Sequence, residues 1–363
     1  MELLLILHIP VHSVNSAYTS TYRKGDTALC LAVKGRHEKV VQLLLEYGAN
    51  VDAKDKFGKT VLHTAVENGN IGIFKILLDS GANVDAQGMY GYTVLHSAVE
   101  RGCSVIVEHV LKHCPDVNYI NTKDKYGRTA LHIASMKGHK QIVIALLEHG
   151  SDINIMSRNN ETPLDVAKAR IIPFYIRVDS DDFNIADILK RHVVKMKTAN
   201  LFVSRKNLLS ISNNDEISGF QNGCEVEIAS MKSEKVGNAN VSFYDILTKD
   251  ISQLAKYAGN DSIVQILRSD DYKIKFPIYA SMINCNFRKG ERRKELLEQG
   301  NNIIHFLFNN FPQLPDDCTE RVFSYLSDKD LRILIAACKP VSVSSPNADI
   351  NNVVITLSIS EMS

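Results

Sequence analysis

A short phrase of sequence returns five times between residues 27 and 165, and it constrains the fold more than any other feature. Each copy begins with a threonine that is followed two residues later by leucine. The threonines are Thr27, Thr60, Thr93, Thr129 and Thr162. Successive threonines are 33, 33, 36 and 33 residues apart. A period of this length is typical of stacked repeats, in which each unit contacts mainly its neighbours.

Each repeat carries the pattern of two helices. An alanine stands five residues after every threonine, where its small side chain lets the first helix approach its neighbour. An apolar pair follows at positions 17 and 18, and we expect it to lie on the second helix and fill the layer between repeats. In the first four repeats the pairs are Leu44 and Leu45, Leu77 and Leu78, Val110 and Leu111, and Leu146 and Leu147.

Glycines mark the turns of the repeat. One precedes each of the first four threonines by two residues and predicts the turn into the next unit: Gly25, Gly58, Gly91 and Gly127. A second set follows the second helix, where a left-handed residue ends a helix at low steric cost. Its members are Gly48, Gly81 and Gly150, with Cys114 in the third repeat.

These motifs carry a family resemblance. The phrase Thr-x-Leu-His, the pair Gly138-His139 and the run Gly-Ala-Asn-Val-Asp at residues 81–85 resemble the ankyrin repeat. The resemblance implies an all-α solenoid of helix pairs, with β-hairpin fingers projecting from one edge. It also implies a role in binding other proteins.

Two repeats depart from the pattern. In the first, glycine stands one position early, so Arg36 is expected to adopt the left-handed conformation at a cost of about 1 kcal/mol. In the fifth, the apolar pair Ile188 and Leu189 comes nine residues late. The insertion, near residues 171–182, is predicted to be a surface loop. We place about five repeats in residues 25–192.

Length and charge limit the functional classes. A chain of 363 residues is expected to contain about two domains. The formal net charge of +1 gives no bulk electrostatic reason to bind nucleic acid or a membrane. Seven cysteines, scattered and never in a Cys-x-x-Cys pair, favour a reducing compartment. We expect a cytoplasmic protein, with a nuclear location left open.

The first residues are interpreted as part of the solenoid. Residues 1–9 are apolar, but they lack the basic start and the small-residue cleavage site of a signal peptide. The favoured interpretation of residues 1–24 is the end of an upstream repeat followed by a long finger; a signal peptide is the alternative.

Three histidines at equivalent positions suggest two different roles. His63, His96 and His132 would suit a metal site by residue type. Equivalent positions of neighbouring repeats lie about 10 Å apart, whereas zinc needs its nitrogen ligands at about 2.1 Å. We therefore expect each imidazole to bond near its own threonine and the neighbouring turn. No metal and no cofactor are predicted.

The resemblance also implies where a partner binds. In ankyrin proteins the finger tips and the exposed face of the first helices hold the target. The corresponding residues are Phe57, Glu67, Asn68, Met89, Tyr90, Tyr92, Arg101 and Tyr126. Aromatic and methionine side chains on exposed tips suit binding hot spots. In the alternative, Phe57, Tyr90 and Tyr126 pack finger against finger.

The periodicity ends after residue 192. Residues 193–240 are expected to form a linker and one amphipathic helix, since apolar residues recur at helical spacing: Ile217, Phe220, Cys224, Ile228 and Met231. A helical domain is predicted over residues 241–340 and a flexible tail over residues 341–363. The basic run at residues 288–295 is interleaved with glutamates and is interpreted as an exposed helix start. A nuclear-import or nucleic-acid role is its alternative.

The end of the helical domain carries a second resemblance. Its helix–turn–helix pattern is similar to the first part of an F-box, with matches at Leu314, Pro315, Val322, Phe323, Leu326 and Leu331. F-box helices dock onto the Skp adaptor of cullin-based ubiquitin ligases. A plain helical hairpin in a domain core is the alternative. Ankyrin repeats followed by such a segment resemble the ankyrin/PRANC proteins known from poxviruses, some insects and intracellular bacteria.

We predict a protein–protein interaction adaptor. The repeats would recruit a target protein, and the F-box-like segment would dock the Skp adaptor of a cullin ligase. The alternative is an ankyrin scaffold or competitive inhibitor without a ligase link. No enzyme is predicted, because the sequence has no phosphate-binding glycine loop, nucleophile elbow or metal-ligand cluster. No nucleic acid or membrane partner is expected.

Overall fold

The protein is helical throughout the part described by its computed structural model. That part comprises residues 26–55, 57–113, 117–169, 184–211, 217–309 and 326–337. It contains no β-strand, only three isolated bridges, so the predicted all-α fold class is confirmed. The chain divides into two compact units, residues 1–291 and 292–363.

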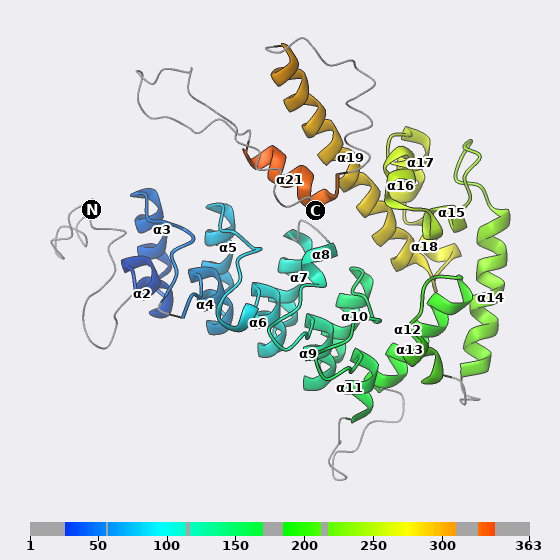
Figure 1. Ribbon diagram of the computed structural model, residues 1–363, viewed down its shortest axis with the longest axis horizontal. Helices are drawn as coiled ribbons and strands as arrows, with labels where there is room; N and C mark the ends of the chain where they lie inside the picture. Colours follow the sequence, from blue (N-terminus) through cyan, green and yellow to red (C-terminus); the bar gives the residue numbers. More distant parts are fainter. Residues whose placement is uncertain are drawn as a thin grey trace, which may run out of the picture. The chain divides into compact units, whose positions relative to one another are not determined.

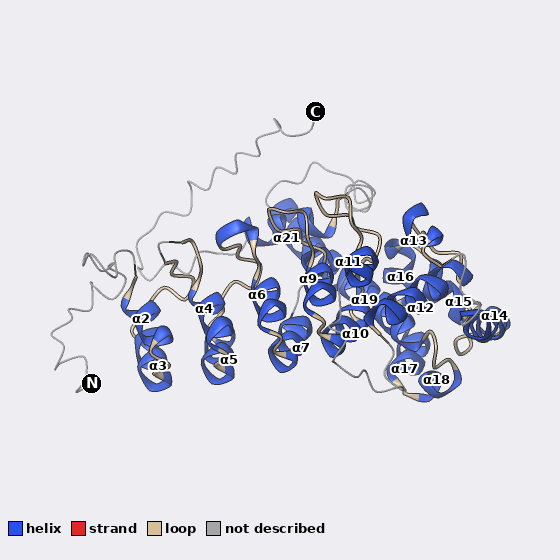
Figure 2. Cartoon of the chain, turned by 90° about the horizontal axis from the view of Figure 1, so that it is seen from below, coloured by secondary structure: helices blue, strands red, loops and turns tan. Residues whose placement is uncertain are grey.

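The repeats form successive helix pairs (Figure 1). In order, the pairs are α2 (Ala28–Lys34) with α3 (Glu38–Glu46), α4 (Val61–Asn68) with α5 (Ile71–Asp79), α6 (Val94–Arg101) with α7 (Ser104–His113), α9 (Ala130–Lys137) with α10 (Lys140–Glu148), and α11 (Pro163–Ala169) with α12 (Ile185–Thr198). Figure 2 shows the first helices of these pairs in one row and the second helices in another. Two short helices, η2 (Met89–Gly91) and α8 (Val117–Ile120), lie in the connections.

Three recurring residues determine where the first helix of a pair begins, how it packs and where it ends. In the first, third and fifth repeats the threonine caps the first helix, as Thr93 does by accepting a hydrogen bond from the backbone N–H of His96. The alanine that follows is fully buried in the middle repeats, as Ala98 shows. Glycine ends this helix in the left-handed conformation, except that Arg36 replaces it in the first repeat with φ 59°. The prediction for Arg36 is confirmed.

The fingers differ from the hairpins expected. Within the described residues their arms form no strands, only isolated bridges such as the one between Lys54 and Thr60 and a backbone hydrogen bond such as that from the Asp124 N–H to the Arg128 carbonyl at 2.9 Å. Hydrogen bonds also join one finger to the next along the stack. The N–H of Lys125 donates to the carbonyl of Tyr90 at 2.8 Å, and the N–H of Arg158 donates to that of Tyr126 at 2.9 Å. Each finger is therefore held both by its own turn and by its neighbour.

Helix α12 continues past residue 192, where the repeats were expected to end. Helix α12 runs unbroken to Thr198, with Leu189 fully buried as predicted for the late apolar pair. Ser204 then caps α13 (Arg205–Leu209). Six residues separate α12 from α13, whereas fourteen separate α3 from α4, so α13 does not stand in the register of a sixth first helix.

A second core follows in the same unit. It is built by α14 (Ser218–Ser233), α15 (Phe243–Thr248), α16 (Ile251–Tyr257), α17 (Asp261–Arg268), α18 (Asp271–Lys275) and the first part of α19 (Ala280–Asn309). The predicted amphipathic helix is α14, which buries Cys224, Ile228 and Met231. Helix α12 serves both cores, because Val193 belongs to the repeat core and Val194 to the second one.

The unit from residue 292 onward has a small core of its own. The second part of α19 packs against α21 (Asp328–Ala337), where Leu296 and Leu331 are buried. A buried ion pair joins the two helices, with Arg293 Nη1 2.8 Å from Asp328 Oδ1. Leu314, Pro315, Val322 and Phe323 lie outside the described residues.

Candidate protein-binding groove

Two positions of the second to fifth repeats line a pair of pockets. The first is the residue before the repeat threonine, at the base of the finger: Lys59, Tyr92, Arg128 and Glu161. The second lies seven residues after the threonine, on the first helix: Glu67, Glu100, Met136 and Ala169. Each of the eight side chains lines one of the two pockets, which together with the interval between them are called the groove. The repeat therefore places the same two positions on the groove while the residue types vary.

The upstream pocket lies between the second and third repeats and has a volume of about 290 Å³. It brings together four residues of the predicted binding set: Glu67, Met89, Tyr90 and Tyr92. Lys59, His63, Gly88, Ser97 and Glu100 complete its lining.

The upstream pocket is acidic at its helical side. Glu67 pairs with Lys59 at 2.6 Å, and Glu100 pairs with Lys137, a residue outside the lining. Both glutamate side chains are 39% exposed. Exposed ion pairs contribute only about 0–1 kcal/mol, so either carboxylate can exchange its lysine for a cation of a partner.

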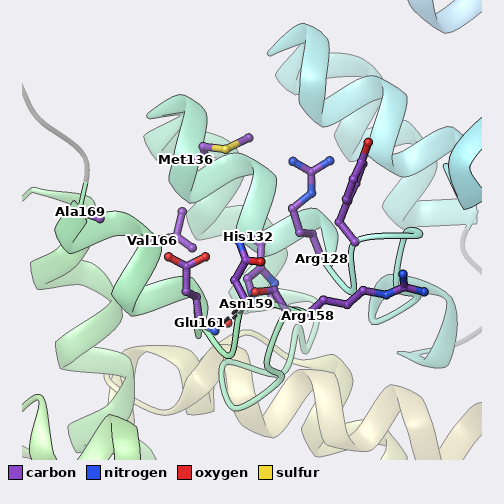
Figure 3. A pocket seen from close by; sticks show the side chains of 10 residues that line it. Arg128, His132, Met136, Arg158, Asn159, Glu161, Val166 and Ala169 are labelled. Carbon is purple, nitrogen blue, oxygen red and sulfur yellow. Dashed lines mark hydrogen bonds between the residues drawn. The ribbon is translucent and has the colours of Figure 1, made fainter.

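The downstream pocket lies between the fourth and fifth repeats and has a volume of about 480 Å³ (Figure 3). Met136, 40% exposed, and Val166 and Ala169 give it an apolar side. Arg158 and Glu161 supply charge, and Figure 3 shows Glu161 pointing toward α11 while Arg158 extends the other way. Tyr126, Arg128, His132, Ser157 and Asn159 complete the lining.

The interval between these pockets is bridged by side chains. Arg128 Nη2 donates to the hydroxyl of Tyr92 at 2.9 Å, and Arg128 Nε donates to Asp124 at 2.9 Å. Between the two neighbouring fingers, the Lys125 ammonium lies 3.3 Å from the centre of the Tyr90 ring, a cation–π contact. Burial raises the pKa of Tyr92 above its ordinary value, so its phenol stays protonated and accepts from Arg128.

The three repeat histidines hold the base of the groove. Each Nε2 lies within hydrogen-bond distance of the carbonyl at the base of the next finger: Tyr92 at 3.1 Å for His63, Arg128 at 3.3 Å for His96, and Glu161 at 3.0 Å for His132. A carbonyl only accepts, so Nε2 carries the proton. Each Nδ1 then accepts from the repeat threonine's hydroxyl, at 2.8–2.9 Å. The predicted structural role is confirmed.

Burial keeps these histidines neutral. Loss of solvent lowers the pKa of His63 and His132, and it lowers that of His96 to about 4. The carbonyls that they hold belong to groove-lining residues. The histidines are therefore positioning residues for the groove, and they span from one repeat to the next.

The remaining predicted contact residues have other surroundings. Asn68 donates to the Val33 carbonyl at 3.3 Å, and Arg101 donates to the Glu67 carbonyl. Both residues thus link neighbouring repeats. Phe57 is half-exposed on its finger and lines neither pocket.

The alternative prediction, in which the aromatic residues of the finger tips pack against neighbouring fingers, is confirmed in part. Tyr90 and Tyr126 join neighbouring fingers through their backbone carbonyls, yet their side chains remain about half-exposed. Groove residues absent from the prediction include Arg128, Met136, Arg158 and Val166. The repeat register was the signal for Arg128 and Met136, since each stands at a position where another repeat already supplies a predicted residue.

The structure corrects the docking role predicted for one residue of the F-box-like set. Leu331 is fully buried and Leu326 partly buried, and both pack with Leu296. Leu331 is therefore a core residue of this unit and not an accessible docking residue. The physical reason is that Leu296 on α19 needs an apolar partner, and α21 supplies it.

The described residues contain no group of three or more histidine, cysteine, aspartate or glutamate side chains arranged to hold a metal ion. None of the helices among them has the length and apolar character required to cross a bilayer.

Comparison with known families finds two matches. A model of ankyrin repeats in three copies matches residues 1–88 and 86–157. A model of the PRANC domain matches residues 238–336. No curated protein matches the chain.

Proposed function

The chain is an ankyrin-repeat protein with a C-terminal PRANC domain, and we propose that it is a non-catalytic adaptor between a target protein and a Skp-containing cullin ligase. Ankyrin repeats bind proteins, and the PRANC domain is F-box-like. In this proposal the repeats hold the target, the C-terminal segment docks the Skp adaptor, and any catalysis belongs to the ligase.

The groove is the observation that carries the recruiting half. Its two pockets collect exposed apolar and charged side chains from several repeats, and burying such a surface stabilises a complex. The proposed contact residues are those of the predicted set that line a pocket, together with those that only the structure identifies. They are Glu67, Met89, Tyr90, Tyr92, Glu100, Tyr126, Met136 and Arg158.

A scaffold or competitive inhibitor without a ligase link is the second candidate. The observation that favours it is the burial of Leu331 against α19. A leucine that already completes a core gives less apolar surface to a docking partner. In this case the C-terminal unit would only be a folded end of the chain, and target binding by the groove would be the whole activity.

Capture from cell lysate separates the two candidates. We expect the intact chain to retain the Skp adaptor and cullin, detected by immunoblot. A triple variant, Leu314→Ala with Pro315→Ala and Phe323→Ala, should lose both. The matched control is Leu209→Ala, which removes an exposed leucine of α13 and should retain both. If neither the intact chain nor the control captures the adaptor while circular dichroism shows both folded, the scaffold is the better description.

A further inference from the structure

We infer that the groove recognises an extended segment of its target that presents two anchor side chains on one face, about six residues apart. One anchor is basic and enters the upstream pocket. The other is aliphatic, lies next to a carboxylate, and enters the downstream pocket. This inference rests on the proposed function, because it specifies what the recruiting groove holds.

The groove offers alternating open and closed intervals. In each pocket, two side chains from neighbouring finger bases line an open cavity. They are Lys59 and Tyr92 in the upstream pocket, and Arg128 and Glu161 in the downstream pocket. In the interval between them the equivalent pair, Tyr92 with Arg128, is hydrogen-bonded directly at 2.9 Å. A bound segment therefore meets a pocket, a ridge and a pocket.

The spacing of the pockets sets the spacing of the anchors. Neighbouring helices pack about 10 Å apart, so pockets separated by two repeats lie about 20 Å apart. An extended chain rises about 3.3 Å per residue, so about six residues cover that distance. Because side chains alternate between faces, two residues separated by six positions point the same way. A helix would advance only about 9 Å over those six residues.

The upstream pocket selects a cation. Its two lining carboxylates are each held by an exposed lysine, Glu67 by Lys59 and Glu100 by Lys137. Exposed ion pairs of this kind contribute little to stability. An arginine or lysine of the target would therefore displace one of these lysines and pair with its carboxylate.

The downstream pocket selects an aliphatic side chain with an acid beside it. Met136 leaves 40% of its surface exposed beside Val166 and Ala169, so an aliphatic side chain gains buried area there. Among the described residues the Arg158 guanidinium has no carboxylate partner, whereas Arg128 is already paired with Asp124. A carboxylate of the segment would pair with Arg158. The Glu161 carboxylate is placed to accept from a backbone N–H of the bound segment.

A display selection with random linear peptides on the full-length chain tests the inference. We expect enriched peptides to share a basic residue and an aliphatic residue beside Asp or Glu, about six positions apart. An enriched peptide is then labelled, and its binding is followed by fluorescence anisotropy. Adding or removing two spacer residues keeps both anchors on one face but shifts them by about 7 Å, which should weaken binding about tenfold.

Matched variants assign each anchor to its pocket. Glu67→Lys with Glu100→Lys should weaken binding about tenfold or more, whereas Glu108→Lys on the second helix α7 should change it less than about twofold. Met136→Ser should weaken binding, whereas Met156→Ser, at a residue of similar exposure outside both pockets, should not. Circular dichroism checks that each variant is folded.

Two results would overturn the inference. One is that no linear peptide is enriched, which would indicate a folded target surface. The other is enrichment of peptides that are insensitive to the pocket variants or to the spacer. Capture of the Skp adaptor by the same protein is measured in parallel, so retained capture without peptide recognition overturns only this inference and leaves the adaptor function in place.

Discussion

At the scale of single residues, the buried histidines couple stability to pH. His96 is neutral when folded, with its pKa lowered to about 4 by burial, while the unfolded value is near 6.5. As pH falls from about 6.5 to about 4, His96 takes up a proton in the unfolded chain but not in the folded chain. The free energy of unfolding therefore decreases in this pH window. The ceiling for this one residue is about 3 kcal/mol.

A substitution isolates that contribution. His96→Leu should lower the free energy of unfolding at pH 7.5 by about 2–4 kcal/mol, since it leaves the Thr93 N–H and the Arg128 carbonyl without their partner. Urea titrations between pH 7.5 and pH 4.5 should show a smaller loss of stability on acidification in the variant than in the unmodified chain. An equal loss in both proteins would exclude His96 as a source of the pH dependence.

A buried carboxylate provides the second residue-scale prediction. Glu227 of α14 accepts hydrogen bonds from the backbone N–H groups of Ile278 and Tyr279, at 3.1 and 2.8 Å. These groups stand just before α19, where helix N–H groups lack internal partners. Glu227→Ala should reduce the free energy of unfolding by about 2–3 kcal/mol. Glu225→Ala, on the exposed face of α14, is the control and should leave the urea midpoint unchanged.

At the scale of elements, one ion pair holds α21 to α19. Arg293 and Asp328 are both largely buried, and Arg293 also donates to the Leu326 carbonyl at 2.6 Å. Removing one member of a buried pair costs about 3–5 kcal/mol, because the other charge stays buried. Arg293→Met should therefore loosen α21, seen as faster hydrogen exchange of the amides at residues 328–337. Arg292→Met, whose own ion pair is exposed, should leave that exchange unchanged.

At the scale of the whole molecule, helix α12 makes the repeats and the second core of the first unit depend on each other. Val194 is fully buried in the second core, while neighbouring Val193 belongs to the repeat core. Val194→Ala should cost about 2 kcal/mol and should speed hydrogen exchange in α11 as well as in α14. Val226→Ala, at a residue 72% exposed on α14, is the matched control. Faster exchange confined to α14 would show that the two cores open independently.

The sequence by itself determined the repeat architecture. Each repeat contacts mainly its neighbours, so a period of about 33 residues was enough to predict the helix pairs, their buried leucines and the turns. The inter-repeat role of the histidines followed for the same reason. It depends on a threonine three residues away and on a finger at a fixed distance along the chain.

Only the tertiary structure decided which groove intervals are open, where α12 ends and what Leu331 does. Tyr92 closes an interval because Arg128, 36 residues later, is long enough to reach its hydroxyl. Helix α12 runs on to Thr198 because Val194 packs into the second core. Leu331 is buried because α19 supplies Leu296 opposite it. In each case the outcome depends on a partner that a local pattern does not contain.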